Sequence, residues 1–184
     1  GERTVNGVGV TITQMSGGAA DINVTDIIAA MGDTAYDFIA VPWNDTDSLE
    51  KFATELNDTS GRWSYARMLY GHVLTVKRGA APDALNSLLE FGLTRNDQHC
   101  SVLGIEDAFA SPLFDVLGAL TGLAAANIAI DPARPLQSLT LEGIIGTPLG
   151  KGFDLTGRNT LLLNGIAAQL TQSDRSVQLN RLIT

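Results

Sequence analysis

Two periodicities of apolar residues divide the chain into short segments. Alternation of apolar and polar residues over residues 4–14 and 136–141 is typical of strands with one buried face. Short apolar runs, such as residues 36–41 ended by Pro42, are typical of buried strands. The pattern predicts strands at residues 4–14, 36–41, 72–77, 100–105, 136–141, 166–171 and 177–183.

Apolar residues three and four positions apart predict helices between these strands. The carboxylates after Asp45 favour a helix amino terminus, and Ser111-Pro112 is a typical helix start. The predicted helices cover residues 23–31, 45–57, 62–69, 82–93, 111–127 and 156–164, and a glycine-rich loop covers residues 143–152.

The helix at residues 111–127 is apolar almost all round, so we expect it to lie against a sheet with little exposure. Gly118 and Gly122 are four residues apart, a spacing that favours helix pairing in membranes. Asp115 and Asn127 lie within the same run and favour a buried helix over a membrane-spanning one.

The order of these elements predicts the fold class. Strands alternate with helices over residues 36–141, and connections of helical length favour parallel strands with right-handed crossovers. The last two strands are separated by residues 172–175, which predicts a hairpin. We therefore expect an α/β fold with a mostly parallel central sheet flanked by helices and an antiparallel C-terminal hairpin. No internal repeat is visible, so residues 1–184 are treated as one domain.

Composition narrows the classes of function. Charged residues are 17% of the 184 residues, against about 25% in typical domains, which predicts a surface rich in neutral groups. A net charge of −8 and only 6% aromatic residues disfavour nucleic-acid binding. The single cysteine, Cys100, excludes a disulfide within the chain. No signal peptide is visible, and the start without Met leads us to expect an excised fragment.

Motifs for catalysis or nucleotide binding are incomplete. The glycines at residues 7–12 and 150–152 match neither a dinucleotide fingerprint nor a P-loop, and no Gly-x-Ser-x-Gly elbow is present. His72 with Cys100 is a geometrically possible dyad, and a pair of acids for glycoside chemistry stays open. The carboxylate pairs at residues 45–47 and 106–107 lack a completing metal-ligand set. We predict no catalytic, cofactor-binding or metal-binding residue and no cofactor.

Several segments resemble the contractile tail sheath proteins of Mu-like phages and prophages. They are residues 111–122 and 127–137, the latter with the run Asp-Pro-Ala-Arg-Pro-Leu, together with Arg-Asn at 158–159, Leu-Leu at 161–162, Gly-Ile at 165–166 and Arg-Leu-Ile-Thr at 181–184.

The resemblance implies a structural, non-enzymatic subunit whose central domain is subtilisin-like in fold. Family members form hexameric rings that stack helically around a tail tube above a baseplate, and the sheath contracts to drive the tube through the host envelope. It implies a virion component made in the bacterial cytoplasm, without nucleic-acid binding or membrane insertion. The chain would be a central fragment without the terminal arms, and monomeric alone. The alternative is a small α/β enzyme or nucleotide-binding domain.

Charge is unevenly divided along the chain. Residues 1–60 carry ten acidic and two basic residues, whereas residues 61–184 carry ten of each. In a sheath, the acidic part is a candidate for one half of a complementary contact between subunits, although a solvated acidic face explains it equally well. The candidate inter-subunit residues are Asp45, Asp47 and Glu50 on the acidic side, and Arg62, Arg67, Lys77, Arg78 and Arg95 on the basic side.

Overall fold

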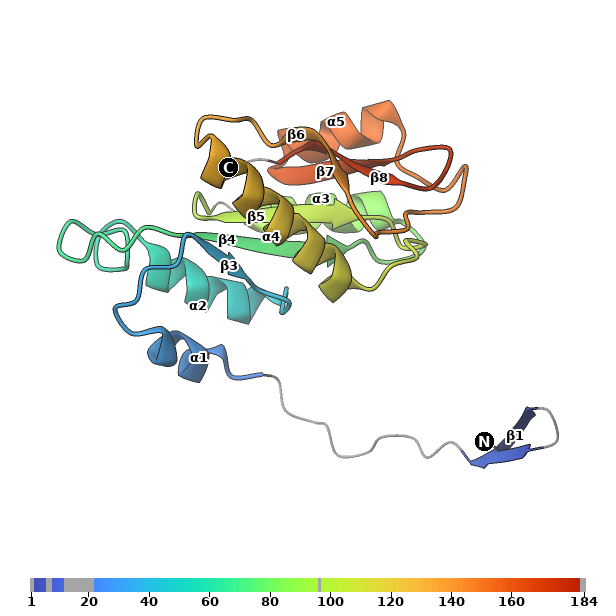
Figure 1. Cartoon of the computed structure of the whole chain (residues 1–184), viewed down its shortest axis with the longest axis horizontal. Coiled ribbons are helices and arrows are strands. Elements are labelled where there is room, and N and C mark those ends of the chain that lie inside the picture. Colours follow the sequence, from blue (N-terminus) through green and yellow to red (C-terminus); the bar gives the residue numbers. More distant parts are fainter. Residues whose placement is uncertain (1, 6–7, 12–21, 96, 183–184) are drawn as a thin grey trace.

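A computed structural model describes residues 2–5, 8–11, 22–95 and 97–182 (Figure 1). The strands are β1 (Glu2–Val5), β2 (Val8–Thr11), β3 (Phe38–Ala40), β4 (His72–Arg78), β5 (Cys100–Ile105), β6 (Gln137–Leu141), β7 (Ile166–Thr171) and β8 (Val177–Arg181). The helices are α1 (Val24–Met31), α2 (Thr46–Leu56), α3 (Ala84–Thr94), α4 (Leu113–Ile130) and α5 (Leu155–Leu163).

Six strands form the central sheet in the order β3-β4-β5-β7-β8-β6. Strands β3, β4, β5 and β7 are parallel neighbours. Strand β8 is antiparallel to both β7 and β6, so β6 runs in the same direction as β7 and only β8 is reversed. The predicted α/β class, with a mostly parallel sheet and an antiparallel C-terminal hairpin, is confirmed. The insertion of β8 between β7 and β6 was not predicted.

The two faces of the sheet are covered unequally. Residues alternate along β4, so Leu74 packs toward α4 on one face while Val73 packs toward α2 on the other. Helices α3 and α5 share the α2 side: Leu88 of α3 and Leu161 of α5 pack on Val102 of β5. Among the described elements, helix α4 therefore covers its face of the sheet alone, whereas α2, α3 and α5 cover the opposite face.

The expectation that α4 has little exposure is wrong. Only 22% of the helix is buried, Phe114 is 66% exposed and Ile130 is 79% exposed. The reason is that no second layer lies over the outer side of α4 in the described part of the chain. A Cβ added at Gly118 or Gly122 would meet no atom within 4 Å, so packing inside this chain does not require these glycines. By length and composition alone α4 could cross a membrane; here it packs on β3, β4 and β6.

The N-terminal segment differs from the expected strand at residues 4–14. Strands β1 and β2 pair antiparallel, with Val5 opposite Val8, so the chain reverses between them. The sequence signal that was missed is Asn-Gly at residues 6–7, the preferred pair of a two-residue hairpin. Residues 12–14 lie outside the described part of the chain.

The helix expected at residues 62–69 is also wrong, because the segment forms successive turns. The Arg62 N–H donates to the carbonyl oxygen of Glu55 at 2.6 Å, and the Leu69 N–H donates to the Arg62 carbonyl at 2.8 Å. Met68 has a φ of 51°, outside the helical region. The bond from Leu69 spans seven residues in place of the four of an α-helix ladder, and α2 satisfies the Arg62 N–H.

Candidate functional site

The three acidic candidates lie at the start of α2. The Asp45 carboxylate caps the helix by accepting the Ser48 N–H at 2.8 Å. Burial acts to raise the pKa of Asp45, but the hydrogen bonds from Ser48 and the charge of Lys77 together lower it. Asp47 is 77% exposed and pairs with Lys51 at 2.8 Å. The exposed Glu50 carboxylate has no hydrogen bond or ion pair with any described residue.

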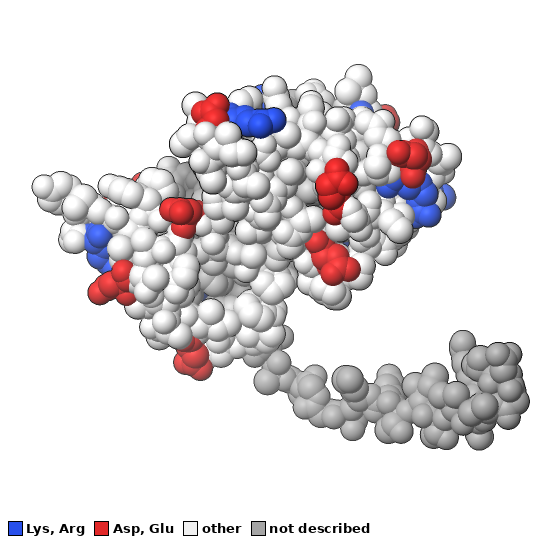
Figure 2. Space-filling view, viewed as in Figure 1, with Lys and Arg blue, Asp and Glu red and all other residues white. Residues whose placement is uncertain are grey.

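A groove of about 380 Å³ runs between α1 and α2 beside these carboxylates. Its lining combines apolar and polar groups with an excess of negative charge: Thr25, Ile28, Asp47, Glu50, Lys51, Thr54 and Glu55. We call it the α1–α2 groove. On the side of the molecule that Figure 2 shows, acidic and basic residues form small separate groups on a mostly uncharged surface.

Arg62, a basic candidate, is only 1% exposed. Its guanidinium donates to the carbonyl oxygen of Gly32 at 2.7 Å and to that of Thr34. The Glu55 carboxylate lies 3.8 Å away, and the Tyr36 ring centroid lies 5.9 Å from the guanidinium carbon. Arg62 thus joins the α1–β3 connection to the end of α2 inside this chain.

Arg67 and Arg95 are paired within the chain as well. Arg67 contacts the Glu55 carboxylate at 2.9 Å and that of Asp33 at 3.3 Å. The hydrogen bond to Glu55 and the nearby negative charges raise the pKa of Arg67. Arg95, largely buried, pairs with Asp97 at 3.3 Å.

Lys77 and Arg78 end β4 and bind neighbouring loops. The Lys77 ammonium donates to the side-chain oxygen of Asn44 at 3.1 Å and lies 4.8 Å from the Phe91 ring centroid. Burial lowers its pKa, and Asp45 opposes this shift. Arg78 donates to the carbonyl oxygens of Asp107, Phe109 and Ser111, which holds the β5–α4 loop. All five basic candidates are therefore engaged within this chain, while the inter-subunit roles of the eight candidates stay predictions.

The structure reveals other cations that the sequence reasoning passed over. Within residues 61–95 and 97–182, Arg134, Lys151 and Arg181 are exposed and have no side-chain hydrogen bond or ion pair with a described residue. Arg134 and Arg181 line one hollow of about 280 Å³, together with Ile128, Pro132, Ala133, Pro135, Leu136, Gln137 and Leu182. We call it the β6–β8 hollow. A sequence signal was present, since Arg134 stands between Pro132 and Pro135, and prolines at this spacing favour a loop.

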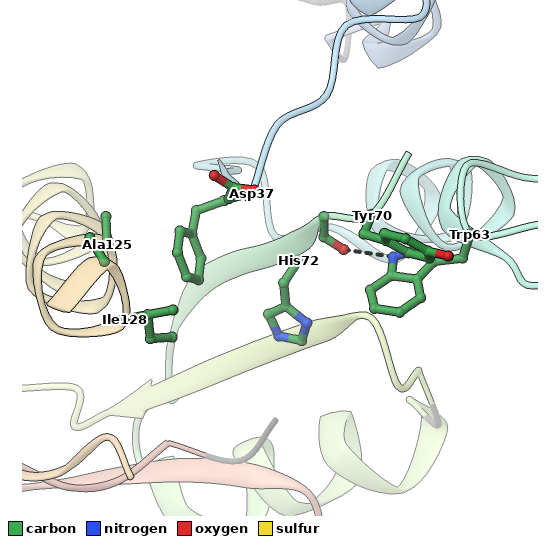
Figure 3. A pocket seen from close by; sticks show the side chains of 9 residues that line it. Asp37, Trp63, Tyr70, His72, Ala125 and Ile128 are labelled. Carbon is green, nitrogen blue, oxygen red and sulfur yellow. Dashed lines mark hydrogen bonds between the residues drawn. The ribbon is translucent and has the colours of Figure 1, made fainter. Parts of the chain in front are cut away.

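A larger hollow of about 570 Å³ lies at the amino ends of β3 and β4 (Figure 3). Its lining is mostly apolar and aromatic: Asp37, Phe38, Trp63, Tyr70, Gly71, His72, Ala125, Ile128 and Ala129. The Trp63 indole donates to the Gly71 carbonyl at 2.8 Å, which is the dashed line in Figure 3. Burial, and then the charge of His99, lower the pKa of His72, while Asp97 opposes the shift.

Nucleophilic chemistry has weak support around His72. The His72 Nε2 lies 2.7 Å from the Ser101 hydroxyl, a contact the sequence analysis did not foresee. Ser101 is buried, however, so a substrate would not reach its hydroxyl. The dyad considered from the sequence fares no better, because burial raises the pKa of the Cys100 thiol to about 12.

The carboxyl ends of the parallel strands are where α/β proteins commonly bind nucleotides. Here the hollow is small, about 160 Å³. Glu106 lies on it, fully buried, and its carboxylate accepts hydrogen bonds from the Thr147 hydroxyl at 2.8 Å, the Gln169 amide at 2.5 Å and the Phe153 N–H at 3.0 Å. A buried carboxylate with these donors holds the glycine-rich loop and disfavours phosphate. In the described part of the chain, no three His, Cys, Asp or Glu residues gather as metal ligands.

The sequence profile of the phage tail sheath protein central domain matches residues 17–184. The chain belongs to the phage tail sheath protein family. It is also similar to the Mu-like prophage FluMu tail sheath protein of Haemophilus influenzae, with 29% identity over 184 residues. That alignment covers 100% of this chain and 36% of the relative, so the chain spans about a third of the relative's length.

Membership of the tail sheath family confirms the resemblance found in the sequence. The family is a structural one and gives no support to the alternative of a small α/β enzyme.

Proposed function

We propose that this chain is the central part of a structural subunit of a contractile phage tail sheath. The subunit polymerises around a tail tube and contracts to drive the tube through the host envelope. The observation that carries the proposal is the match of the tail sheath central domain to residues 17–184. The name of the prophage relative, which aligns over the whole chain, supports it.

The partners follow from this role. Sheath subunits contact one another in hexameric rings and a helical stack, and the assembly meets a tail tube and a baseplate as a component of the virion, made in the bacterial cytoplasm. Heterologous contacts that do not close generate helical filaments. Contraction requires two arrangements of such contacts that differ in free energy. The role is structural, without catalysis or cofactor.

Residues 1–184 form one domain of the longer subunit in this proposal, with an acidic part at 1–60 and a neutral part at 61–184. Among the candidate contact residues, Asp45, Asp47 and Glu50 offer exposed negative charge near the start of α2. The engaged basic residues, such as Arg62, act in this proposal by holding the loops that shape the contact surface.

Electron microscopy of the full-length protein tests the proposal. Purified protein is expected to form tubes or contracted cylinders, because polymerisation is the function of a sheath. A protein that stays monodisperse at all concentrations, with and without tail tubes, would contradict it. In this proposal the 184-residue chain alone is monomeric in sedimentation analysis, because the terminal arms that the family resemblance implies are what link neighbouring subunits. A nucleotide-dependent rise in melting temperature would instead favour the enzyme alternative.

A further inference from the structure

We infer that neighbouring sheath subunits meet by docking the α1–α2 groove of one copy onto the β6–β8 hollow of the next. This inference rests on the proposed function, because it names the surfaces through which the sheath polymerises. It assigns the basic half of the contact to Arg134 and Arg181 rather than to the five cations expected from the sequence.

The β6–β8 hollow presents positive charge that its own chain does not use. Arg181 ends β8, opposite Gln137 of β6, and Arg134 lies in the loop that leads into β6. Neither guanidinium has an ion pair or hydrogen bond with a described residue. The carboxylate in the same loop, Asp131, accepts the Ala133 N–H at 3.0 Å. The exposed side chains of Pro132 and Pro135 line the same hollow and give it an apolar surface, together with buried Leu136 and Leu182.

The α1–α2 groove presents the opposite charge. Glu50 is exposed and unpaired among the described residues, and Asp47 is held only by Lys51, one helical turn away. Exposed pairs at this spacing are weak, so Asp47 can exchange Lys51 for a stronger partner. Ile28 supplies an apolar surface in the groove. Two carboxylates beside an apolar patch complement two guanidiniums beside another, and guanidinium binds carboxylate with two parallel hydrogen bonds.

The two surfaces lie at opposite ends of the sheet. Strand β3 is one edge of the six-stranded sheet, with α1 and α2 beside it, and β6 is the other edge (Figure 1). One copy cannot join its own groove to its own hollow, so the contact needs a second copy. Because the two surfaces differ, the contact is heterologous and each copy keeps one free surface for the next. Repetition gives a ring or a helix of copies.

A second copy of this chain fits the hollow better than a polyanion. The chain has a net charge of −8, so its long-range field repels nucleic acid and anionic membranes. An acidic groove on another copy delivers its carboxylates at a fixed spacing, and both partners are present at high concentration in a growing sheath.

The test is charge reversal with rescue in the full-length protein. The variants are Asp47→Lys with Glu50→Lys, Arg134→Glu with Arg181→Glu, and all four substitutions together. Each double variant is expected to reduce the polymerised fraction in a sedimentation assay about tenfold or more, and the quadruple variant to restore it to within about threefold of wild type. The matched control is Lys151→Glu, an exposed and unpaired cation outside both surfaces, which is expected to polymerise as wild type does.

The possible outcomes separate the two proposals. Two results overturn the docking inference and leave the sheath role standing. In one, the double variants polymerise as well as the wild type. In the other, the double variants lose polymerisation and the quadruple variant does not regain it. Failure of the wild type to polymerise at all contradicts the sheath role, and the docking inference with it. Circular dichroism of each variant establishes that a loss is not due to unfolding.

Proximity provides a second measurement. Wild-type Cys100 should not react with a short bismaleimide, because burial raises its thiol pKa to about 12. A protein carrying Glu50→Cys and Arg134→Cys is expected to give a ladder of cross-linked multimers, since each copy links to two neighbours. Multimers that form equally well with Glu50→Cys and Lys151→Cys would contradict the assigned partner.

Discussion

The acidic first 60 residues and the neutral remainder differ less in their number of charges than in how those charges are used. In the first part, Glu50 and Asp37 carry carboxylates without a described partner, and Asp47 has only a weak one. In the remainder, most cations bind carbonyl oxygens or carboxylates of their own chain, as Arg62 and Arg78 do. The net charge of a stretch of sequence therefore shows where carboxylates are in excess, but it does not show which cations are available to a partner.

The comparison also separates buried from exposed charge within one chain. Arg62 in the remainder is bound to backbone from the first part, so it stabilises the fold rather than an interface. Arg134 and Arg181 have the same formal charge, but they line the β6–β8 hollow and have no ion pair or side-chain hydrogen bond with a described residue. Four sets of substitutions test this distinction and are given in order of decreasing expected effect.

The largest effect is expected from Arg62→Met. Removing the buried guanidinium leaves the carbonyl oxygen of Thr34 without its donor and that of Gly32 with only the longer bond from Arg67 at 3.5 Å, and it removes a charge near Glu55. The free energy of unfolding should fall by about 2–4 kcal/mol, measured by urea denaturation. The control Arg181→Met should change it by less than about 0.5 kcal/mol. Equal losses in both variants would remove the distinction between engaged and free cations.

A smaller effect is expected from Asp45→Ala. The substitution removes the N-cap of α2, whose carboxylate accepts the Ser48 N–H. Unfolding free energy should decrease by about 1 kcal/mol. Asp47→Ala, two residues later, loses only an exposed pair with Lys51 and should cost no more than about 0.5 kcal/mol. A reversed order of the two losses would show that the cap is not the main role of Asp45.

The pH dependence of the free energy of unfolding should distinguish His72, in the neutral part, from Asp45, in the acidic part. Burial lowers the pKa of His72 below its ordinary 6.5, so the folded protein favours the neutral ring and stability falls as pH drops below about 6.5 toward the folded pKa. The net pKa of Asp45 is lowered below 3.8, so its contribution is present above pH 3.8 and is lost as pH falls below that value. In urea titrations, His72→Gln should reduce the loss of stability below about pH 6.5 and leave the loss below pH 3.8 unchanged. An unchanged slope between pH 7 and 5 would contradict the assignment to His72.

The smallest effect on stability is expected from Glu50→Gln and Arg134→Gln. Both side chains are exposed and unpaired with described residues, so the melting temperature of the 184-residue chain should hardly change, corresponding to less than about 0.5 kcal/mol. A clear drop for either variant would reveal an intramolecular role and weaken its assignment to a contact between copies.

Local signals predicted most of the fold. Helix α2 was expected at residues 45–57 and is Thr46–Leu56 with Asp45 as its cap, because capping and apolar spacing act within a few residues. The segment at 62–69 was mispredicted for the opposite reason: its backbone and the Arg62 side chain bind groups seven to thirty residues away. The sequence shows that Arg134 is flanked by prolines. It does not show whether the side chain is paired, because that depends on which residues distant in sequence lie beside it.

The sequence by itself determined the family, the alternation of strands and helices, the parallel arrangement of most strands and the excess of acid in the first 60 residues. The family follows from the resemblance of particular sequence segments, and the other features depend on short-range periodicity, capping and composition, which a linear chain displays directly. Only the tertiary structure decided that β8 lies between β7 and β6, and that α4 is the one described helix on its face of the sheet. It also decided that Arg62 is buried while Arg134 and Arg181 share a hollow. The physical reason is that burial and pairing of a charge depend on groups distant in sequence, and folding alone brings those groups together.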